Sequence, residues 1–207
     1  MPHSHRGGAR AVPAMSAPAR GGGAFVPLYR RVLGGALDRL PGPLRRLHDH
    51  DGARSAAGRC DVERGDGLAA RLVAACFAMP PAGRNLPVQV RFSTRDGVET
   101  WQRDFAGHRL SSRQGAEPGR PGHLYERFGI GHFVLRPEVS GEGLDLRLVG
   151  VRLLRLPLPR ALWPRIVGRE RVDGAGRFTF EVSIVLPLGG LLIAYRGYLV
   201  PEGEGAA

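Results

Sequence analysis

The chain has 207 residues, 43% of them hydrophobic, which is enough for one domain with its own core. Its formal net charge is +11, but all 30 basic residues are arginines spread along the sequence, with no run of five or more like charges. Binding to nucleic acid requires a clustered basic patch, so the composition argues against that function. No segment approaches the roughly 20 apolar residues of a membrane-spanning helix. The basic amino-terminal stretch lacks the apolar core of a secretion signal, and we therefore expect a cytoplasmic protein.

The first elements in the chain are a tail and two short helices. Residues 1–24 consist mainly of Gly, Pro, Ala, Ser and Arg, and we expect them to form a disordered tail. Residues 28–40 carry apolar side chains at spacings of three and four, the pattern of an amphipathic helix. A second helix carrying Leu44 and Leu47 is expected to follow it.

Ligand-type side chains first concentrate at His48-Asp49-His50-Asp51. Two histidines among carboxylates suit zinc binding or acid–base chemistry, but at this spacing on a helix they point to different faces, and no third ligand is near. A polar helix end, where histidine suits the last carbonyls, is the interpretation that we favour, and we predict no metal site. His48 follows the apolar Leu47 and can face inward, so it is a candidate for acid–base catalysis.

A strand and a third helix come next. Residues 53–62 are predicted to form the strand, and residues 68–79 an apolar, buried helix that covers the concave side of the sheet. Cys76 lies in that helix and is expected to be buried as a small hydrophobic residue. Together, Cys60 and Cys76 make neither a disulfide framework nor a metal-binding motif.

From residue 86 onward, alternating polar and apolar side chains predict antiparallel strands joined by short turns. One of these strands places Glu99, Trp101, Arg103 and Phe105 on a single face. If that face points inward, Arg103 beside Trp101 can hold an anionic head group by charge and cation–π contact. If it points outward, it is an ordinary solvated surface, which is the interpretation that the sequence slightly favours.

The short strand over residues 124–128 places Glu126 between apolar neighbours on its face. Such a carboxylate is either paired with an arginine or has a raised pKa, and pairing is favoured in a chain so rich in arginine. Glu126 is the second candidate for acid–base catalysis, and Arg127 is a candidate for contacting a polar head group. The following Gly129-Ile130-Gly131 lacks the third glycine of a dinucleotide fingerprint, so we predict no cofactor site.

Two segments complete the expected sheet. The proline-rich residues 156–164 are expected to cross an open end of the sheet, with Trp163 as a core plug or part of a ligand mouth. Residues 177–186 alternate as a half-buried strand does. Residues 191–200 are apolar on both faces, which is typical of a strand that lies centrally or lines a closed interior. Gly197 in that strand predicts a bend or a close backbone approach.

These elements predict an α+β fold, in which a curved antiparallel sheet or partly closed β-barrel of roughly seven to ten strands packs against two or three helices. We expect a single domain over residues 25–200, followed by a flexible tail over residues 201–207. Curved sheets with helices in the mouth often enclose an apolar cavity. The residues expected to bind a ligand there are Trp101, Arg103, Phe105, Arg127, Trp163 and Tyr195.

Several motifs follow one another in a fixed order. They are Leu28-Tyr29-Arg30-Arg31-Val32-Leu33-Gly34, Met79-Pro80-Pro81-Ala82-Gly83, Glu99-x-Trp101-x-Arg103-x-Phe105, Tyr125-Glu126-Arg127, Leu156-Pro157-Leu158-Pro159 and Tyr195-x-Gly197-Tyr198-Leu199. In this order they resemble an uncharacterised bacterial family, domain of unknown function 4166. The resemblance implies no catalytic residues, because the family has no agreed activity. Its members resemble stand-alone domains or carboxyl-terminal partners of saccharopine-dehydrogenase-like, NAD-binding proteins, which implies a separate NAD-binding oxidoreductase as a partner.

Three functions are compatible with these features. The leading hypothesis is a non-enzymatic binding module for an apolar or amphipathic, lipid-like ligand held in a cavity of the sheet. The alternative is an accessory or catalytic domain in NAD-dependent oxidoreductase chemistry, which requires that His48 and Glu126 meet in one cleft. The third is a protein-interaction domain that docks a partner through a sheet edge or the proline-rich segment. Whether the chain is an enzyme stays open at this point.

Overall fold

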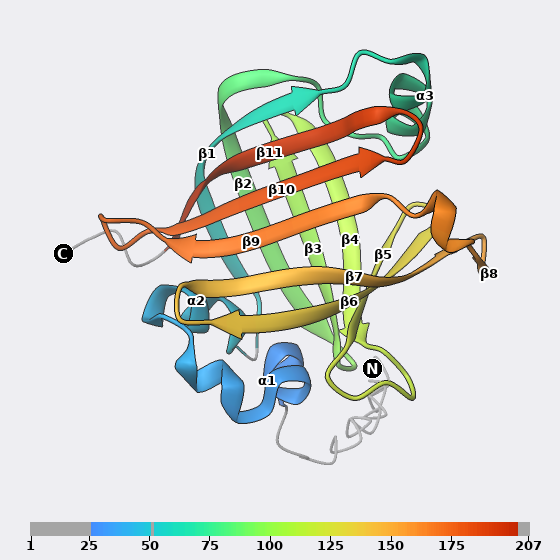
Figure 1. Cartoon of the computed structure of the whole chain (residues 1–207). Helices are drawn as coiled ribbons and strands as arrows, with labels where there is room; N and C mark the ends of the chain where they lie inside the picture. The colour runs from blue at the N-terminus through green and yellow to red at the C-terminus, as the bar shows by residue number, and fades with distance from the viewer. Residues whose placement is uncertain (1–25, 51, 203–207) are drawn as a thin grey trace, which may run out of the picture.

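The computed structural model describes residues 26–50 and 52–202, and their strands form one antiparallel sheet that closes on itself (Figure 1). The tail that the sequence predicts over residues 1–24 lies outside the described residues. So do Asp51 and, from the expected carboxyl-terminal tail, residues 203–207. The strands of the barrel are β1 (Arg54–Arg64), β2 (Gly83–Arg95), β3 (Val98–Phe105), β4 (His108–Ala116), β5 (Leu124–Phe128), β6 (Gly131–Ser140), β7 (Gly143–Leu153), β9 (Arg165–Val172), β10 (Phe178–Leu186) and β11 (Gly190–Pro201).

Closure of the ring depends on one pairing between strands that are far apart in sequence. The ten strands of the barrel pair in chain order, with β7 next to β9, and the pairing of β1 with β11 completes the ring. The two-residue β8 (Leu156–Pro157) pairs only with the end of β7 and stays outside the ring. A closed ring leaves no unpaired strand edge, which removes a common site of aggregation.

The helices are few and short. They are α1 (Leu28–Leu33), the 3₁₀ helix η1 (Gly34–Arg39), α2 (Gly42–His48), α3 (Leu68–Cys76) and the 3₁₀ helix η2 (Arg160–Leu162). The single amphipathic helix expected over residues 28–40 is broken at Gly34, whose φ of +55° lies outside the helical range. Among the described residues, no helix is both long enough and apolar enough to cross a membrane.

The expected antiparallel barrel is present, but the α+β class fits it only loosely, because the structure is mostly β and the barrel is fully closed. The strands β6, β7 and β9–β11 cross in front of β2–β5 in Figure 1, and the helices lie outside the ring of strands. α1 and α2 lie below one mouth, and α3 lies at the upper right (Figure 1). The helices therefore cover the ends of the barrel and do not form a layer on the sheet.

The prediction that α3 is a buried helix is wrong. Only Ala70 and Ala74 of α3 are buried, whereas Leu68 is 75% exposed and Leu72 61% exposed. The two alanines allow the helix to lie close against the barrel, and this leaves its leucines on the opposite face. Cys76 is likewise exposed, contrary to expectation, and both cysteines are free.

The last strand approaches its neighbour closely at Gly197, as the sequence predicts. Gly197 lies opposite Cys60 of β1, and a Cβ atom at Gly197 would stand 2.1 Å from the carbonyl oxygen of Arg59. The β1–β11 pairing that closes the ring therefore depends on the missing side chain.

We expect Gly197→Ala to lower the free energy of unfolding by about 1–3 kcal/mol, because the added methyl group forces β1 and β11 apart. The matched control is Gly174→Ala, since a Cβ atom at Gly174 meets nothing within 4 Å. Urea unfolding followed by tryptophan fluorescence measures both variants. Equal stability of the two variants would show that the close approach is not a constraint.

Candidate functional site

The interior of the barrel contains a cavity of about 390 Å³ with mostly apolar walls. Ligand pockets in proteins commonly measure about 300–1,000 Å³, so the cavity is large enough for a small molecule. Its walls come from inward-facing side chains of β2 to β7 and β9 to β11, with contributions from α1, α2, α3 and the segment around η2. A ring of ten strands is somewhat wider than the eight-stranded ring that side chains just fill.

Strand β10 shows that the interior is not filled. Phe180, Val182 and Ile184 all line the cavity, as their alternation in the sequence predicts. Each of them nevertheless stays only partly buried. These three side chains point into the barrel and still have accessible surface, so the space next to them is not occupied by protein atoms.

Polar side chains gather at the end of the cavity next to α1 and α2. Glu99, Gln114 and Glu126 are neighbours across β3, β4 and β5. Glu99 and Gln114 are almost completely buried, at 1% and 2% exposed. Tyr29 of α1 reaches into this row and donates a hydrogen bond of 3.2 Å to Oε1 of Gln114. The row therefore ties the first helix to the barrel wall.

Arg103 is held by groups of the neighbouring strands. It donates hydrogen bonds to Oγ of Ser112 at 2.9 Å and to Oε1 of Glu126 at 3.4 Å, and it lies over the Trp101 ring at 5.0 Å. Since Trp101 and Phe105 on the same face are buried, the solvated-surface interpretation of this strand is wrong. The expected pairing of Glu126 with an arginine is present.

A second buried ion pair joins α2 to the opposite wall. Nε2 of His48 lies 2.5 Å from Oε2 of Glu170 in β9, and the ring of Tyr29 lies 4.0 Å from that of His48. Burial lowers the pKa of His48, but the Glu170 carboxylate outweighs it through charge and hydrogen bonding, so the pKa is raised. Within the described chain, His48 Nδ1 and one oxygen of Glu99 have no hydrogen-bond partner.

The buried tyrosines keep their protons. Burial, reinforced by the nearby Glu170 carboxylate, raises the pKa of Tyr29. Burial also raises the pKa of Tyr195, to about 12, although Arg103 acts in the opposite direction. Both phenols therefore remain neutral at physiological pH and are available to donate hydrogen bonds.

The residues expected to bind a ligand divide into two groups. Trp101, Arg103, Phe105 and Tyr195 line the cavity. Arg127 does not line it; this side chain is exposed, donates to Nδ1 of His132 and lies over the ring of Tyr125.

Trp163 does not line the cavity either. Its Nε1 donates to the carbonyl oxygen of Leu158, and this bond holds the proline-rich segment in place. Leu158, Leu162 and Pro164 of that segment do line the cavity, which agrees with a segment that crosses an open end.

The two acid–base candidates are engaged separately. Glu126 lines the cavity and pairs with Arg103, whereas His48 pairs with Glu170 and does not itself line the cavity. This arrangement gives little support to a catalytic pair of His48 and Glu126. Among residues 26–50 and 52–202, no group of three or more His, Cys, Asp or Glu side chains could hold a metal ion.

Three polar residues of the site, Tyr29, Gln114 and Glu170, were missed by reasoning from sequence. Period-2 alternation from Ile166 places Glu170 on the inner face of β9. The sequence therefore contained a pattern from which Glu170 could have been predicted. No local pattern marks Tyr29 or Gln114, because their contact joins residues that are 85 positions apart.

Comparison with protein families matches residues 40–199 to the family described as Domain of unknown function (DUF4166). Neither a curated protein nor a solved structure matches the chain. The matched region contains all ten strands of the barrel, apart from the last residues of β11.

We expect the Glu170→Gln substitution to destabilise the protein most at mildly acidic pH. The raised pKa of His48 means that the charged pair contributes fully below the unfolded value of 6.5, and that its contribution is lost as the pH rises through the folded value. The loss of unfolding free energy should be on the order of 2 kcal/mol near pH 6. It should be clearly smaller near pH 9, as urea unfolding at the two pH values measures.

The control for this comparison is Glu181→Gln, which removes a half-exposed partner of Arg169 on the outer face of β10. An exposed pair contributes little, so this variant should stay within about 0.5 kcal/mol of the wild type at both pH values. A pH-independent effect of Glu170→Gln would contradict a charged His48.

Proposed function

We propose that this chain, which belongs to the family of Domain of unknown function (DUF4166), is a binding module for an apolar or amphipathic small molecule held inside the barrel. The cavity of about 390 Å³ carries this proposal, because its walls are apolar and its few polar groups gather at one end. A lipid-like molecule with one polar end fits that division, with its tail along β10 and its polar end near Gln114.

The charges at the polar end suggest which head group the ligand carries. The guanidinium of Arg103 faces the carboxylate of Glu126, and His48 faces that of Glu170. Glu99 adds a third carboxylate, which accepts a hydrogen bond of 3.1 Å from Nε1 of Trp101. An anionic head group would therefore meet more negative than positive charge. We propose an uncharged polar end, such as a hydroxyl group, which donates to a glutamate and accepts from Arg103.

Native mass spectrometry of the purified protein, followed by organic extraction, tests the binding function directly. We expect an apolar molecule bound at about one per chain, because the cavity is sized for one small ligand. The Val182→Trp variant should lose that molecule, since the indole ring occupies the cavity. Filling empty space costs little stability, so the variant should remain folded by circular dichroism.

The matched control is Ser183→Trp, which places the same ring on the outer face of β10. This variant should retain the ligand. A wild-type protein without any bound molecule, and without affinity for apolar fluorescent dyes, would overturn the proposal. That result would favour a protein partner, such as a separate NAD-binding oxidoreductase.

The head-group assignment predicts the effect of Glu126→Gln. Removing this carboxylate leaves Arg103 without its acidic partner, so the cavity should accept anionic amphiphiles more readily. We expect the preference for decanoate over decanol to rise about tenfold, which corresponds to about 1.4 kcal/mol. Displacement of a bound apolar dye by each compound measures the preference.

Glu138→Gln is the control for this measurement, because Glu138 pairs with Arg136 on the outside of the barrel. It should leave the preference unchanged. If Glu126→Gln also leaves it unchanged, the pair of Arg103 and Glu126 does not select the head group.

A further inference from the structure

Most of the large apolar side chains that are exposed within residues 26–50 and 52–202 lie at one end of the barrel. Of the nine large apolar residues exposed in the described part of the chain, seven lie in connections at this end. We call these seven the apolar rim. They are Leu68 and Leu72 of α3, Ile130 between β5 and β6, Leu154 and Leu156 at β8, Leu162 of η2 and Leu188 between β10 and β11.

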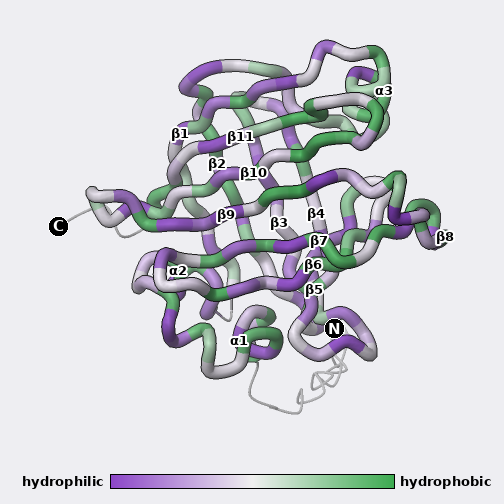
Figure 2. Tube along the Cα trace, viewed as in Figure 1, coloured by the Kyte–Doolittle hydropathy of each residue, from purple (hydrophilic) through white to green (hydrophobic). Residues whose placement is uncertain are grey.

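Contacts between these connections show that they meet in space. The backbone N–H of Leu154 donates a 3.0 Å hydrogen bond to the carbonyl oxygen of Ile130. The ring of Phe77, which follows α3, stacks on Phe128 at 5.6 Å, beside the β5–β6 turn. α3 also packs against β11 and the β10–β11 turn. Figure 1 shows α3, this turn and β8 on the same side of the barrel, and Figure 2 shows hydrophobic residues along them.

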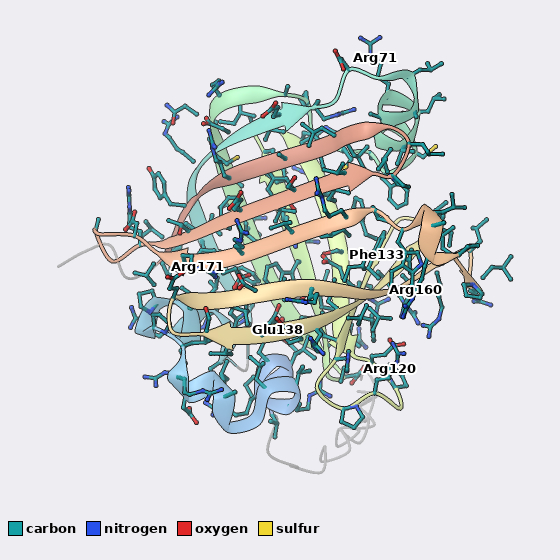
Figure 3. All side chains as sticks on the ribbon, viewed as in Figure 1. Arg71, Arg120, Phe133, Glu138, Arg160 and Arg171 are labelled. Atoms are coloured by element: carbon teal, nitrogen blue, oxygen red, sulfur yellow. The ribbon has the colours of Figure 1, made fainter. Side chains whose placement is uncertain are left out.

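The rim is also basic. Residues 65–72, 129–130, 154–165 and 187–190 contain four exposed arginines and a single acidic residue. They are Arg71, Arg155, Arg160, Arg165 and Asp66. Figure 3 labels Arg71 above α3 and Arg160 near β8. None of the four arginines forms an ion pair within the described chain, so their charges are available to an external anion.

The rim surrounds the accessible end of the cavity. Leu162 belongs to the rim, is 47% exposed and also lines the cavity. The partly buried Phe77 and Leu186 line the cavity next to it. At the other end, Tyr29 and Leu47 of the first helices line the cavity and are buried. An apolar molecule that entered the cavity would therefore pass the rim.

We infer that the apolar rim docks the protein onto the surface of an anionic lipid bilayer, with its leucines among the lipids and its arginines at the head groups. A bilayer accepts separate protruding side chains without a matching shape, whereas a protein partner needs a complementary surface. Leu188, at 91% exposed, protrudes in this way. The excess of arginines over acids on the rim matches the negative charge of anionic lipids.

This inference goes beyond ligand binding, since docking requires no occupant in the cavity. If both hold, docking places the open end of the cavity against the phase in which apolar molecules dissolve. The two properties are measured separately, because vesicle binding and dye displacement are independent assays.

Flotation with lipid vesicles tests the inference on the full chain. We expect binding to vesicles of phosphatidylcholine with about one third phosphatidylglycerol, and weak binding to pure phosphatidylcholine. Raising the salt concentration from about 0.1 M to about 0.5 M should weaken binding, because it screens the arginines. Arg155→Ser with Arg160→Ser should reduce the affinity roughly tenfold or more. Leu72→Ser with Leu188→Ser should reduce it by a similar factor.

Matched controls change the same residue types away from the rim. Arg39→Ser with Arg95→Ser removes two exposed arginines at the α1 end, and Val200→Ser removes an exposed apolar side chain of β11. Both should bind vesicles as the wild type does. In every variant, an added apolar compound should still displace the bound dye as it does in the wild type. If the two arginine variants lost affinity equally, the effect would reflect net charge alone, and this would overturn the inference. An equal loss in Val200→Ser and in the rim leucine variant would overturn it too. A dimer that the rim leucines hold together, without vesicle binding, would overturn it in favour of a second copy of the chain.

Discussion

Closure of the ring is the constraint on which the rest of the structure depends. Because β1 pairs with β11 and closes the series of strands, the number of strands sets the width of the interior. Ten strands enclose more space than the mainly apolar side chains of the inner faces occupy, and the helices contribute side chains only at the two ends. The cavity is therefore a consequence of the topology. A single substitution can change the polarity of the cavity walls, but it does not change the number of strands that creates the cavity.

The two ends of the interior differ in chemistry because different elements cover them. At one end, α1 and α2 bring Tyr29 and His48 against Gln114 and Glu170, so polar groups are buried with partners. Such groups are costly to bury alone, and each contact therefore also fixes where its helix lies. At the other end, α3 and η2 present leucines to the solvent. The cavity thus has a polar, closed end and an apolar, accessible end, so its two ends are chemically different.

Local patterns predicted the strands well, because a strand with one buried face repeats every two residues. The alternation in β3 and β10 correctly grouped Trp101 with Arg103 and Phe180 with Val182. Closure was predicted only in part: the two apolar faces of residues 191–200 indicated a closed interior, but no local pattern identifies β1, far away in the sequence, as the partner of that strand. The apolar composition of α3 indicated burial, but it could not distinguish a core helix from one with exposed leucines. Similarly, nothing in the residue types separates Arg103, which faces the cavity, from the exposed Arg127.

The pairing of the first strand with the last also determines when the protein can finish folding during its synthesis. Ala56 of β1 pairs with Pro201 of β11, so the ribosome must release nearly the whole domain before the ring can close. Until then, β1 has an unpaired edge beside a sheet whose inner face is apolar, a combination that favours association with other chains. The last step of folding therefore joins strands that are far apart in sequence, and such contacts form more slowly than local ones.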